Sequence, residues 1–224
     1  MLTLALDTTS RTMSVALLQD DQLVAELFAD AGKQHAETLL PAIAHVLDEA
    51  GYVARDIDLF ACATGPGSFT GVRVGLSTAK GLARAFERSL VGVSSLEALA
   101  MNGILSPLVI CPMLDARRSE VYTALYRPDP DGFLELVDEE RAVKPLEFLE
   151  NLEDDILFMG DGAEVYEATI RDVLKERANF AGSLSNRVRA SSVGRIGLKK
   201  SRGGDIITPL EVMPRYLRPS YVGR

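Results

Sequence analysis

A glycine-rich turn between a short apolar run and a helical pattern constrains the fold of this chain more than any other stretch. Residues 59–63 are apolar and typical of a buried strand, and residues 64–68 hold two glycines and a proline. After the turn, small residues recur every four positions, on one stripe of a helix: Gly71, Gly75, Ala79 and Ala83. The pattern predicts a strand, a tight turn and a helix that continues to Phe86, as in α/β folds.

The turn does not match two familiar phosphate-binding motifs. A P-loop needs lysine after its last glycine, where Val72 stands, and a dinucleotide fingerprint needs glycine at the position of Thr70. Ser68 or Thr70 can cap the helix, whose N-terminus suits an anion. The small-residue stripe therefore indicates close packing or a partner surface, with direct anion binding as the alternative.

Length and composition limit the classes of protein. The 224 residues allow one large domain or two lobes of about 100 residues each. A hydrophobic fraction of 47% indicates a filled core, and the net charge of −8 argues against a general nucleic-acid binder. Cys62 and Cys111 lie in apolar runs and are expected to be reduced core residues. With no signal-peptide pattern and no apolar run of 18 residues, we expect a cytoplasmic protein without membrane contact.

The order of elements indicates two lobes, 1–103 and 104–224. The first is expected to begin with three strands in an antiparallel meander and to continue with alternating helices and strands. Its expected elements are strands 2–6, 13–18, 23–28, 59–63 and 90–93, and helices 34–50, 71–86 and 95–102. The second lobe is too short for a full copy of the first. Its expected elements are strands 108–114, 120–126, 133–137 and 156–159, and helices 145–151, 163–176 and 191–200.

Five spaced segments carry a resemblance to a known family. They are residues 4–10, 35–41, 65–73 (Gly-Pro-Gly-Ser-Phe-Thr-Gly-Val-Arg), 115–122 and 214–222. In this order they resemble the TsaB (YeaZ) family. The resemblance implies an α/β, actin-like ATPase (ASKHA, ribonuclease H-like) fold with two lobes, the second reduced. It also implies a non-catalytic scaffold that binds TsaD, together with TsaE, for threonylcarbamoyl transfer to the adenosine next to the anticodon of tRNA. The chain would contact tRNA only through that complex and form a homodimer when alone.

The partner surface is expected on helices 34–50 and 71–86, because their apolar and small-residue faces are wider than one buried face requires. An arginine at Gly75 or Ala79 is therefore expected to give a folded monomer that no longer binds TsaD. The residues assigned to this surface are His35, Leu39, Leu40, Ile43, Leu47, Gly71, Val72, Gly75, Ala79, Leu82 and Ala83.

Two loops match the places where actin-like ATPases hold nucleotide. Asp7, Thr8 and Thr9 follow the first strand, and Gly160, Asp161 and Gly162 follow a later one. The simpler interpretation is a hairpin turn in the first case and an ordinary glycine turn in the second. If the loops are active, the alternative function is an ATPase or small-molecule kinase of the actin-like superfamily.

No catalytic residue, metal ligand or cofactor is predicted. His35 and His45 lie ten residues apart, about 280° around one helix, and cannot share a metal ion. TsaD carries a His-x-x-x-His pair, and the aligned positions here are Ser95 and Leu99. A peptidase, the remaining alternative, would lack both a metal set and a nucleophile motif.

Two groups of arginines have open interpretations. The group of Asp115, Arg117, Arg118 and Glu120 can grip a phosphate or a carboxylate of a partner, or form an ion-pair network between lobes. The tail residues can form a small RNA-contacting patch or pack on the body of the chain: Arg215, Tyr216, Arg218, Tyr221 and Arg224.

Overall fold

The computed structural model describes residues 1–32, 34–204 and 208–218, so Tyr221 and Arg224 lie outside the described residues. The chain divides into two compact units, residues 1–98 with 188–215, and residues 99–187 with the tail from Tyr216. The predicted boundary at 103 put residues 188–215 in the second lobe. The structure places them with the first unit, because helix α7 (Ala190–Arg202) packs on the first sheet.

The first unit contains a five-stranded mixed sheet in the order β3-β2-β1-β4-β5. β1, β2 and β3 form the predicted antiparallel meander, and β4 and β5 continue it as parallel strands. The strands are β1 (Leu2–Asp7), β2 (Thr12–Gln19), β3 (Gln22–Asp30), β4 (Leu59–Ala63) and β5 (Ser89–Val93).

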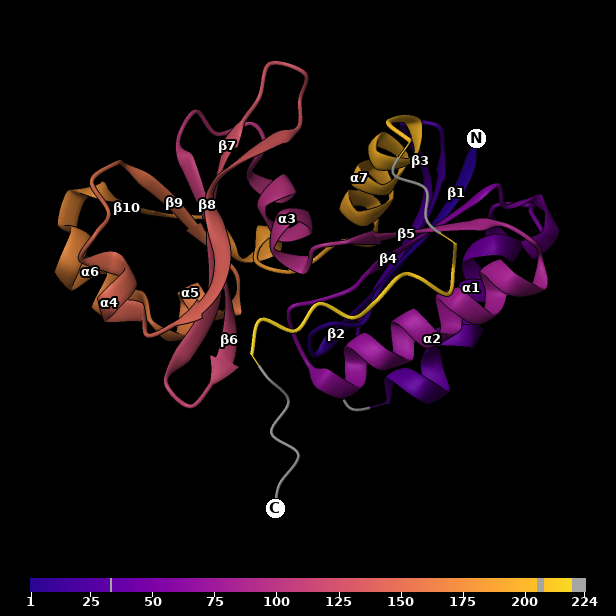
Figure 1. Ribbon diagram of the computed structural model, residues 1–224, viewed down its shortest axis with the longest axis horizontal. Coiled ribbons are helices and arrows are strands. Elements are labelled where there is room, and N and C mark those ends of the chain that lie inside the picture. Colours follow the sequence, from indigo (N-terminus) through magenta and orange to yellow (C-terminus); the bar gives the residue numbers. More distant parts are fainter. Residues whose placement is uncertain (33, 205–207, 219–224) are drawn as a thin grey trace. The chain divides into compact units, whose positions relative to one another are not determined.

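Helices cover both faces of this sheet. α1 (His35–Glu49) and α2 (Phe69–Ala85) lie on one face and α7 on the other, below and above the sheet in Figure 1. Successive side chains of β1 point to opposite faces of the sheet. Leu4 and Leu6 therefore belong to the core with α1 and α2, whereas Ala5 faces Gly194 of α7. α1 ends at Glu49, and Gly51, the residue predicted to terminate it, follows the cap with a φ of +73°.

The N-terminus of α7 is capped by the sheet. The Ala190 amide donates to Ser14 Oγ at 3.0 Å, and the Ser191 amide donates to Glu26 Oε1 at 3.1 Å. Arg189 also pairs with Glu26 at 2.8 Å. Burial tends to raise the pKa of Glu26, but these bonds lower it on balance.

The second unit repeats the strand arrangement of the first. Its sheet has the order β10-β9-β6-β7-β8, with an antiparallel β6-β7-β8 meander and parallel β9 and β10. The strand order of the first unit is complete here, although the lobe is reduced, as expected. The reduction falls on β10, which was not predicted, and on the helices. The strands are β6 (Val109–Arg117), β7 (Glu120–Pro128), β8 (Leu134–Val143), β9 (Ile156–Met159) and β10 (Ala178–Phe180).

The helices of the second unit are short. The predicted helix 163–176 is two helices, because the chain breaks from helical geometry at Tyr166. The helices are α3 (Ser95–Ala100), which straddles the division between the units, α4 (Pro145–Leu149), α5 (Asp161–Val165) and α6 (Glu167–Leu174). Short 3-10 turns occupy Ala54–Asp56, Met101–Gly103, Lys175–Arg177 and Ser183–Ser185.

Candidate functional site

The glycine-rich turn packs directly on the turn between β1 and β2. The Ser68 amide donates to Thr9 O at 2.7 Å, and Ser68 Oγ accepts from the Gly71 amide at 3.3 Å, which confirms Ser68 as the cap. A Cβ atom at Gly67 would lie 2.2 Å from Thr9 O, and one at Gly71 would lie 2.0 Å from Thr8 O. The glycines therefore permit a close approach of two backbone segments.

The small-residue stripe of α2 continues this packing. Thr8 Oγ1 donates to Gly71 O at 2.7 Å, and a Cβ atom at Gly75 would lie 2.4 Å from the same hydroxyl. Ala79 and Ala83 are fully buried. The stripe faces the chain's own sheet, which supports the packing interpretation. Gly75 and Ala79 are both buried against the sheet, so arginine at either position is expected to disturb the packing of α2 and is not a clean test of a partner surface.

Most residues assigned to the partner surface are core residues. The wide apolar stripes combine an inner face, which packs on the sheet, with part of an outer face. The buried members are His35, Leu39, Ile43, Leu47, Gly71, Val72, Gly75, Ala79 and Ala83. Leu40, with 54% of its surface exposed, and the half-buried Leu82 remain accessible. His35 Nε2 bonds Ser10 O at 2.9 Å, which makes this histidine part of the packing.

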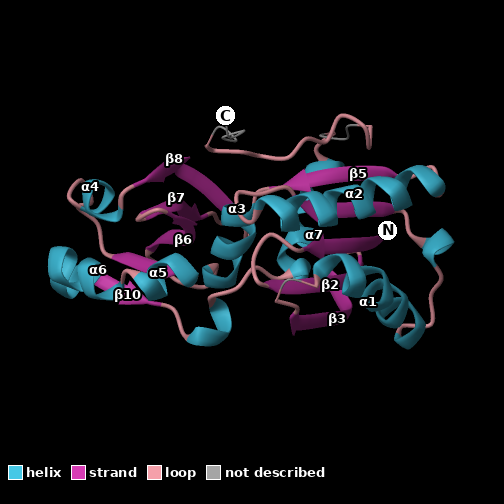
Figure 2. Cartoon of the chain, turned by 90° about the horizontal axis from the view of Figure 1, so that it is seen from below, coloured by secondary structure: helices cyan, strands magenta, loops and turns pink. Residues whose placement is uncertain are grey.

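The outer face of α1 and α2 carries accessible small and apolar residues. We define it by the accessible residues Ala36, Leu40 and Ala44 of α1 and Val74, Ser77, Gly81, Leu82 and Ala85 of α2. In Figure 2 both helices lie in front of the sheet. A groove of about 480 Å³ runs along this face, lined by Ala36, Phe69, Thr70, Arg73, Val74, Ser77 and Thr78. At its rim the Arg73 guanidinium stacks 3.7 Å from the centre of the Phe69 ring.

The Asp7 carboxylate is bonded within its own turn. Asp7 Oδ1 accepts from the Thr9 amide at 3.1 Å and from Thr9 Oγ1 at 2.7 Å. Asp7 Oδ2 is buried without a partner in the described structure. Burial raises the pKa of Asp7 to about 6, although the two bonds from Thr9 lower it in part. This geometry favours the hairpin-turn interpretation and leaves one carboxylate oxygen unexplained.

The second predicted nucleotide loop also packs within its own unit. Gly160 has a φ of +102°, and a Cβ atom there would lie 2.2 Å from Met113 O. The Gly160 amide donates to Asn186 Oδ1 at 3.1 Å. Asp161 Oδ1 accepts from the Asp115 amide at 3.0 Å. Gly160, Asp161 and Gly162 therefore connect β9 and α5 to β6.

Metal-ligand and thiol chemistry have little support in this structure. Within residues 1–32, 34–204 and 208–218, no three histidine, cysteine or acidic side chains gather as a metal site. Ser95 and Leu99 are both fully buried. Cys62 and Cys111 are free and buried, as predicted. Burial raises the pKa of both thiols, that of Cys111 to about 12.

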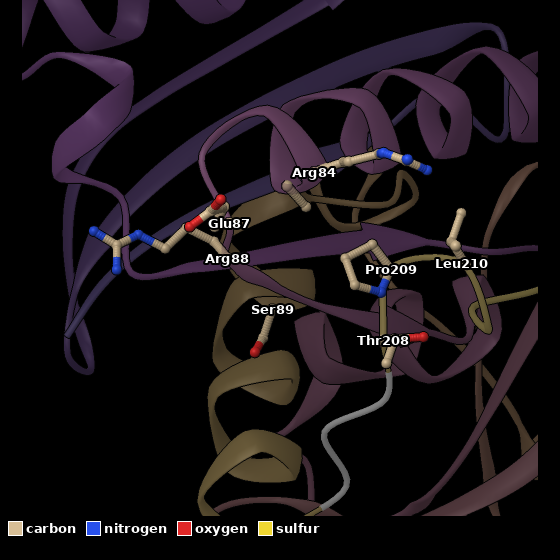
Figure 3. A pocket seen from close by; sticks show the side chains of 8 residues that line it. Arg84, Glu87, Arg88, Ser89, Thr208, Pro209 and Leu210 are labelled. Carbon is tan, nitrogen blue, oxygen red and sulfur yellow. The ribbon is translucent and has the colours of Figure 1, made fainter.

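A second cavity, which the sequence did not predict, lies at the C-terminal end of α2 (Figure 3). It has a volume of about 500 Å³ and is lined by Ala83, Arg84, Glu87, Arg88, Ser89, Thr208, Pro209 and Leu210. Arg84 extends toward the side of Leu210, whereas Arg88 points away from it. The cavity exists because the C-terminal segment folds back on α2, where Lys80 Nζ donates to Leu210 O at 3.2 Å.

The arginine groups are held within their own unit. Arg117 pairs with Asp115 at 3.0 Å, and Arg218 of the tail pairs with Glu120. Both pairs join residues of the second unit, so neither is the expected link between lobes. The Arg215 amide donates to Thr64 O at 2.8 Å. The described part of the tail therefore packs on the body of the chain.

None of the helices in the described residues combines the length and apolarity that a membrane span requires.

Comparison with known proteins identifies relatives along nearly the whole chain. A family model described as TsaD, tRNA N6-adenosine threonylcarbamoyltransferase, matches residues 29–203. The tRNA threonylcarbamoyladenosine biosynthesis protein TsaB of Bacillus subtilis is 34% identical over 218 residues, 96% of this chain and 93% of that protein. TsaB of Escherichia coli is 37% identical over 147 residues, 63% of this chain and 62% of that protein.

Solved structures agree with these relatives. YeaZ from Pseudomonas aeruginosa superposes with a TM-score of 0.82 at 28% identity, covering 96% of this chain and 99% of that one. A ROK hexokinase from Thermus thermophilus has a TM-score of 0.53 at 10% identity, covering 91% and 100%. The second likeness concerns the fold alone and agrees with the predicted actin-like fold.

Proposed function

We propose that this chain is a non-catalytic subunit that binds TsaD, because it belongs to the TsaB family of tRNA threonylcarbamoyladenosine biosynthesis. In this proposal TsaE joins the pair, and tRNA reaches the chain only as part of the complex. The complex acts in the cytoplasm, and this subunit requires no cofactor. The outer face of α1 and α2 is the observation that carries the proposal.

The chemistry of this face suits a helical partner. Ala36, Ala44, Gly81 and Ala85 are exposed and small, so helices of a partner can approach closely. Leu40 and the groove at Val74 offer apolar contacts that are costly to leave in water. The buried residues that the sequence assigned to the partner surface hold α1 and α2 on the sheet. They affect partner binding only by keeping these helices in place.

The same surface is expected to form a homodimer when the chain is alone. The TsaD model matches residues 29–203, a range that includes both helices, so TsaD is expected to have counterparts of α1 and α2. A surface that binds a related surface can also bind a second copy of itself across a two-fold axis. The proposal therefore predicts that TsaD competes with self-association.

The test is size-exclusion chromatography with light scattering on the chain alone and mixed with TsaD. The wild type is expected to be a dimer that exchanges into a one-to-one complex. Leu40→Arg places a charge on the outer face and is expected to give a folded monomer that does not bind TsaD. Leu105→Arg is the matched control, because Leu105 is 97% exposed and lies outside this face. A Leu40→Arg chain that assembles like the control would refute the proposed surface.

One observation favours a second function. The unpartnered Oδ2 of Asp7 lies in the turn where actin-like ATPases contact nucleotide, which supports an ATPase or small-molecule kinase. ATP turnover by the purified chain, lost in Asp7→Asn, would establish this activity. Absence of turnover with and without TsaD would exclude it.

A further inference from the structure

The two helices of the outer face carry charges of opposite sign. α1 contains acidic residues and no lysine or arginine, and α2 contains cations and no acidic residue. Pairs between oppositely charged residues three or four positions apart, such as Glu167 and Arg171 of α6, therefore cannot form within either helix. The charged residues are Glu37, Asp48 and Glu49 of α1 and Arg73, Lys80 and Arg84 of α2.

Two charges on each helix form a row along the outer face. A residue eleven positions farther along a helix points within about 20° of the same direction, about 16.5 Å along the axis. Glu37 and Asp48 have this spacing, and Ala44 of the outer face lies between them on the same stripe. Arg73 and Arg84, both exposed, have the same spacing on α2. The acidic row and the cationic row are therefore equal in length.

The two rows run in the same direction and begin at the same level. β3 and β1 both pair antiparallel with β2, and β1, β4 and β5 are parallel, so β3, β4 and β5 point the same way. α1 and α2 each connect two of these strands and therefore run parallel, side by side in Figure 2. Ala36 of α1 and Arg73 of α2 line the same groove, so the rows begin level with each other. At their other end, Asp48 is level with Arg84.

The charges at this second end have no partner within the described chain. The side chains of Asp48 and Arg84 are exposed and form no ion pair or hydrogen bond with any residue that the structure describes. Asp48 lies in the last turn of α1, where the helix dipole disfavours a negative charge and no basic residue offsets it. Arg73 has contacts in its own chain, including the Phe69 ring. Asp48 and Arg84 are therefore the pair available to a second molecule.

We propose that a second copy of the chain docks on the outer face with its helices parallel to those of the first. α1 of each copy then lies against α2 of the other, and Asp48 of each copy pairs with Arg84 of the other. The inference rests on the proposed function, which places self-association on this face.

Charge complementarity selects this arrangement from the two that a symmetric dimer allows. A two-fold axis parallel to the helices keeps every residue at its own level and exchanges α1 with α2, so the acidic row of one copy meets the cationic row of the other. A two-fold axis across the helices would instead place α1 on α1 in the reverse direction. Asp48 would then lie opposite Glu37 of the second copy, and like charges at an interface repel.

Sedimentation equilibrium at 50 and 500 mM salt measures the dissociation constant of the dimer for chains with one charge reversed. Asp48→Arg and Arg84→Asp should each weaken self-association about tenfold at 50 mM salt, because the dimer contains the pair twice and each reversal turns attraction into repulsion. The effect should shrink at 500 mM salt, which screens exposed charges. Glu153→Arg is the matched control, since Glu153 is exposed and belongs to the second unit.

Mixing the two variants tests the pairing itself and shows that both variants fold. A mixed dimer of Asp48→Arg with Arg84→Asp has opposite charges at both contacts, so it should form about as tightly as the wild-type dimer. The chain that carries both substitutions should also dimerise like the wild type. Tighter self-association of Asp48→Arg alone would place this position opposite Glu37 of the second copy and overturn the inference. Variants that behave like Glu153→Arg, or that do not recover on mixing, would overturn it as well.

The Leu40→Arg chain separates this inference from the proposed function. A wild-type chain that neither self-associates nor binds TsaD refutes both. If Leu40→Arg abolishes self-association and TsaD binding, while the charge reversals leave the dimer unchanged, this inference alone is refuted.

Discussion

Replacing Asp7 with asparagine tests the electrostatics of the buried β1–β2 turn. Asp7 is fully buried, and its pKa is raised from 3.8 to about 6 in the folded chain. A carboxyl group whose pKa is raised by folding binds its proton more tightly in the native state. The native state is therefore favoured at low pH, and this contribution is lost as pH rises through the interval from 3.8 to about 6.

The size of the effect follows from the shift. The difference between the two pKa values corresponds to about 3 kcal/mol in full, of which about 2 kcal/mol has appeared by pH 4.5. Asparagine does not titrate, so the stability difference between wild type and Asp7→Asn should change by about 2 kcal/mol in favour of the wild type from pH 7.5 to pH 4.5. At pH 7.5 asparagine avoids the cost of burying a charged carboxylate. Its amide group, however, places N–H donors where Oδ2 has no partner, which offsets part of that gain in stability.

Urea unfolding at pH 7.5, 6.0 and 4.5 measures this difference. Asp48→Asn, which removes a carboxylate at an exposed position of α1, is the matched control. Thr9→Val removes the hydroxyl that donates to Asp7 Oδ1 and lowers the pKa of Asp7. In chains that keep Asp7, it should therefore enlarge the change of stability with pH. A difference between wild type and Asp7→Asn that is constant with pH would refute the reasoning.

Three further predictions concern stability and thiol reactivity. Gly75→Ala should destabilise the chain by about 1–3 kcal/mol, because its Cβ would lie 2.4 Å from Thr8 Oγ1. Gly81→Ala on the open side of the same helix should stabilise it by about 0.5–1 kcal/mol, and equal effects in urea unfolding would contradict the assigned faces. Glu26→Ala should cost about 1–3 kcal/mol, because it leaves the Ser191 amide without its acceptor and removes the carboxylate partner of Arg189. A melting temperature close to that of the wild type would argue against this cap. Cys62 and Cys111 should react with a thiol reagent only in denaturant, and labelling of the native chain would show that the cores open.

The elements of the fold were largely predictable because their signals are local. The apolar runs of β1 and β4, the glycine after α1 and the cap at Ser68 each specify their element within a few residues. β10 and the break at Tyr166 were missed, since β10 has three residues and pairs with β9 in parallel, a contact that no short-range pattern reveals.

The site was predictable only at the level of helices. Hydrophobic periodicity identifies an apolar stripe but does not say which part of it faces the sheet, so Leu39 and Ile43 were assigned to a partner although both lie in the core. Small residues were ambiguous for the same reason: Gly75 and Gly81 belong to one helix, and only the structure shows Thr8 beside the first and open space beside the second. The cavity at Leu210 depends on a contact 130 residues apart in sequence.

Hydrogen–deuterium exchange of the chain, alone and with TsaD, tests the outer face of α1 and α2 most directly. We expect TsaD to increase protection in peptides covering residues 36–49 and 69–85, relative to the chain diluted to a monomer. Peptides of β8 and α6 should exchange alike in both states, since they lie in the second unit. Protection by TsaD in the second unit, with α1 and α2 exchanging as in the free monomer, would contradict the account.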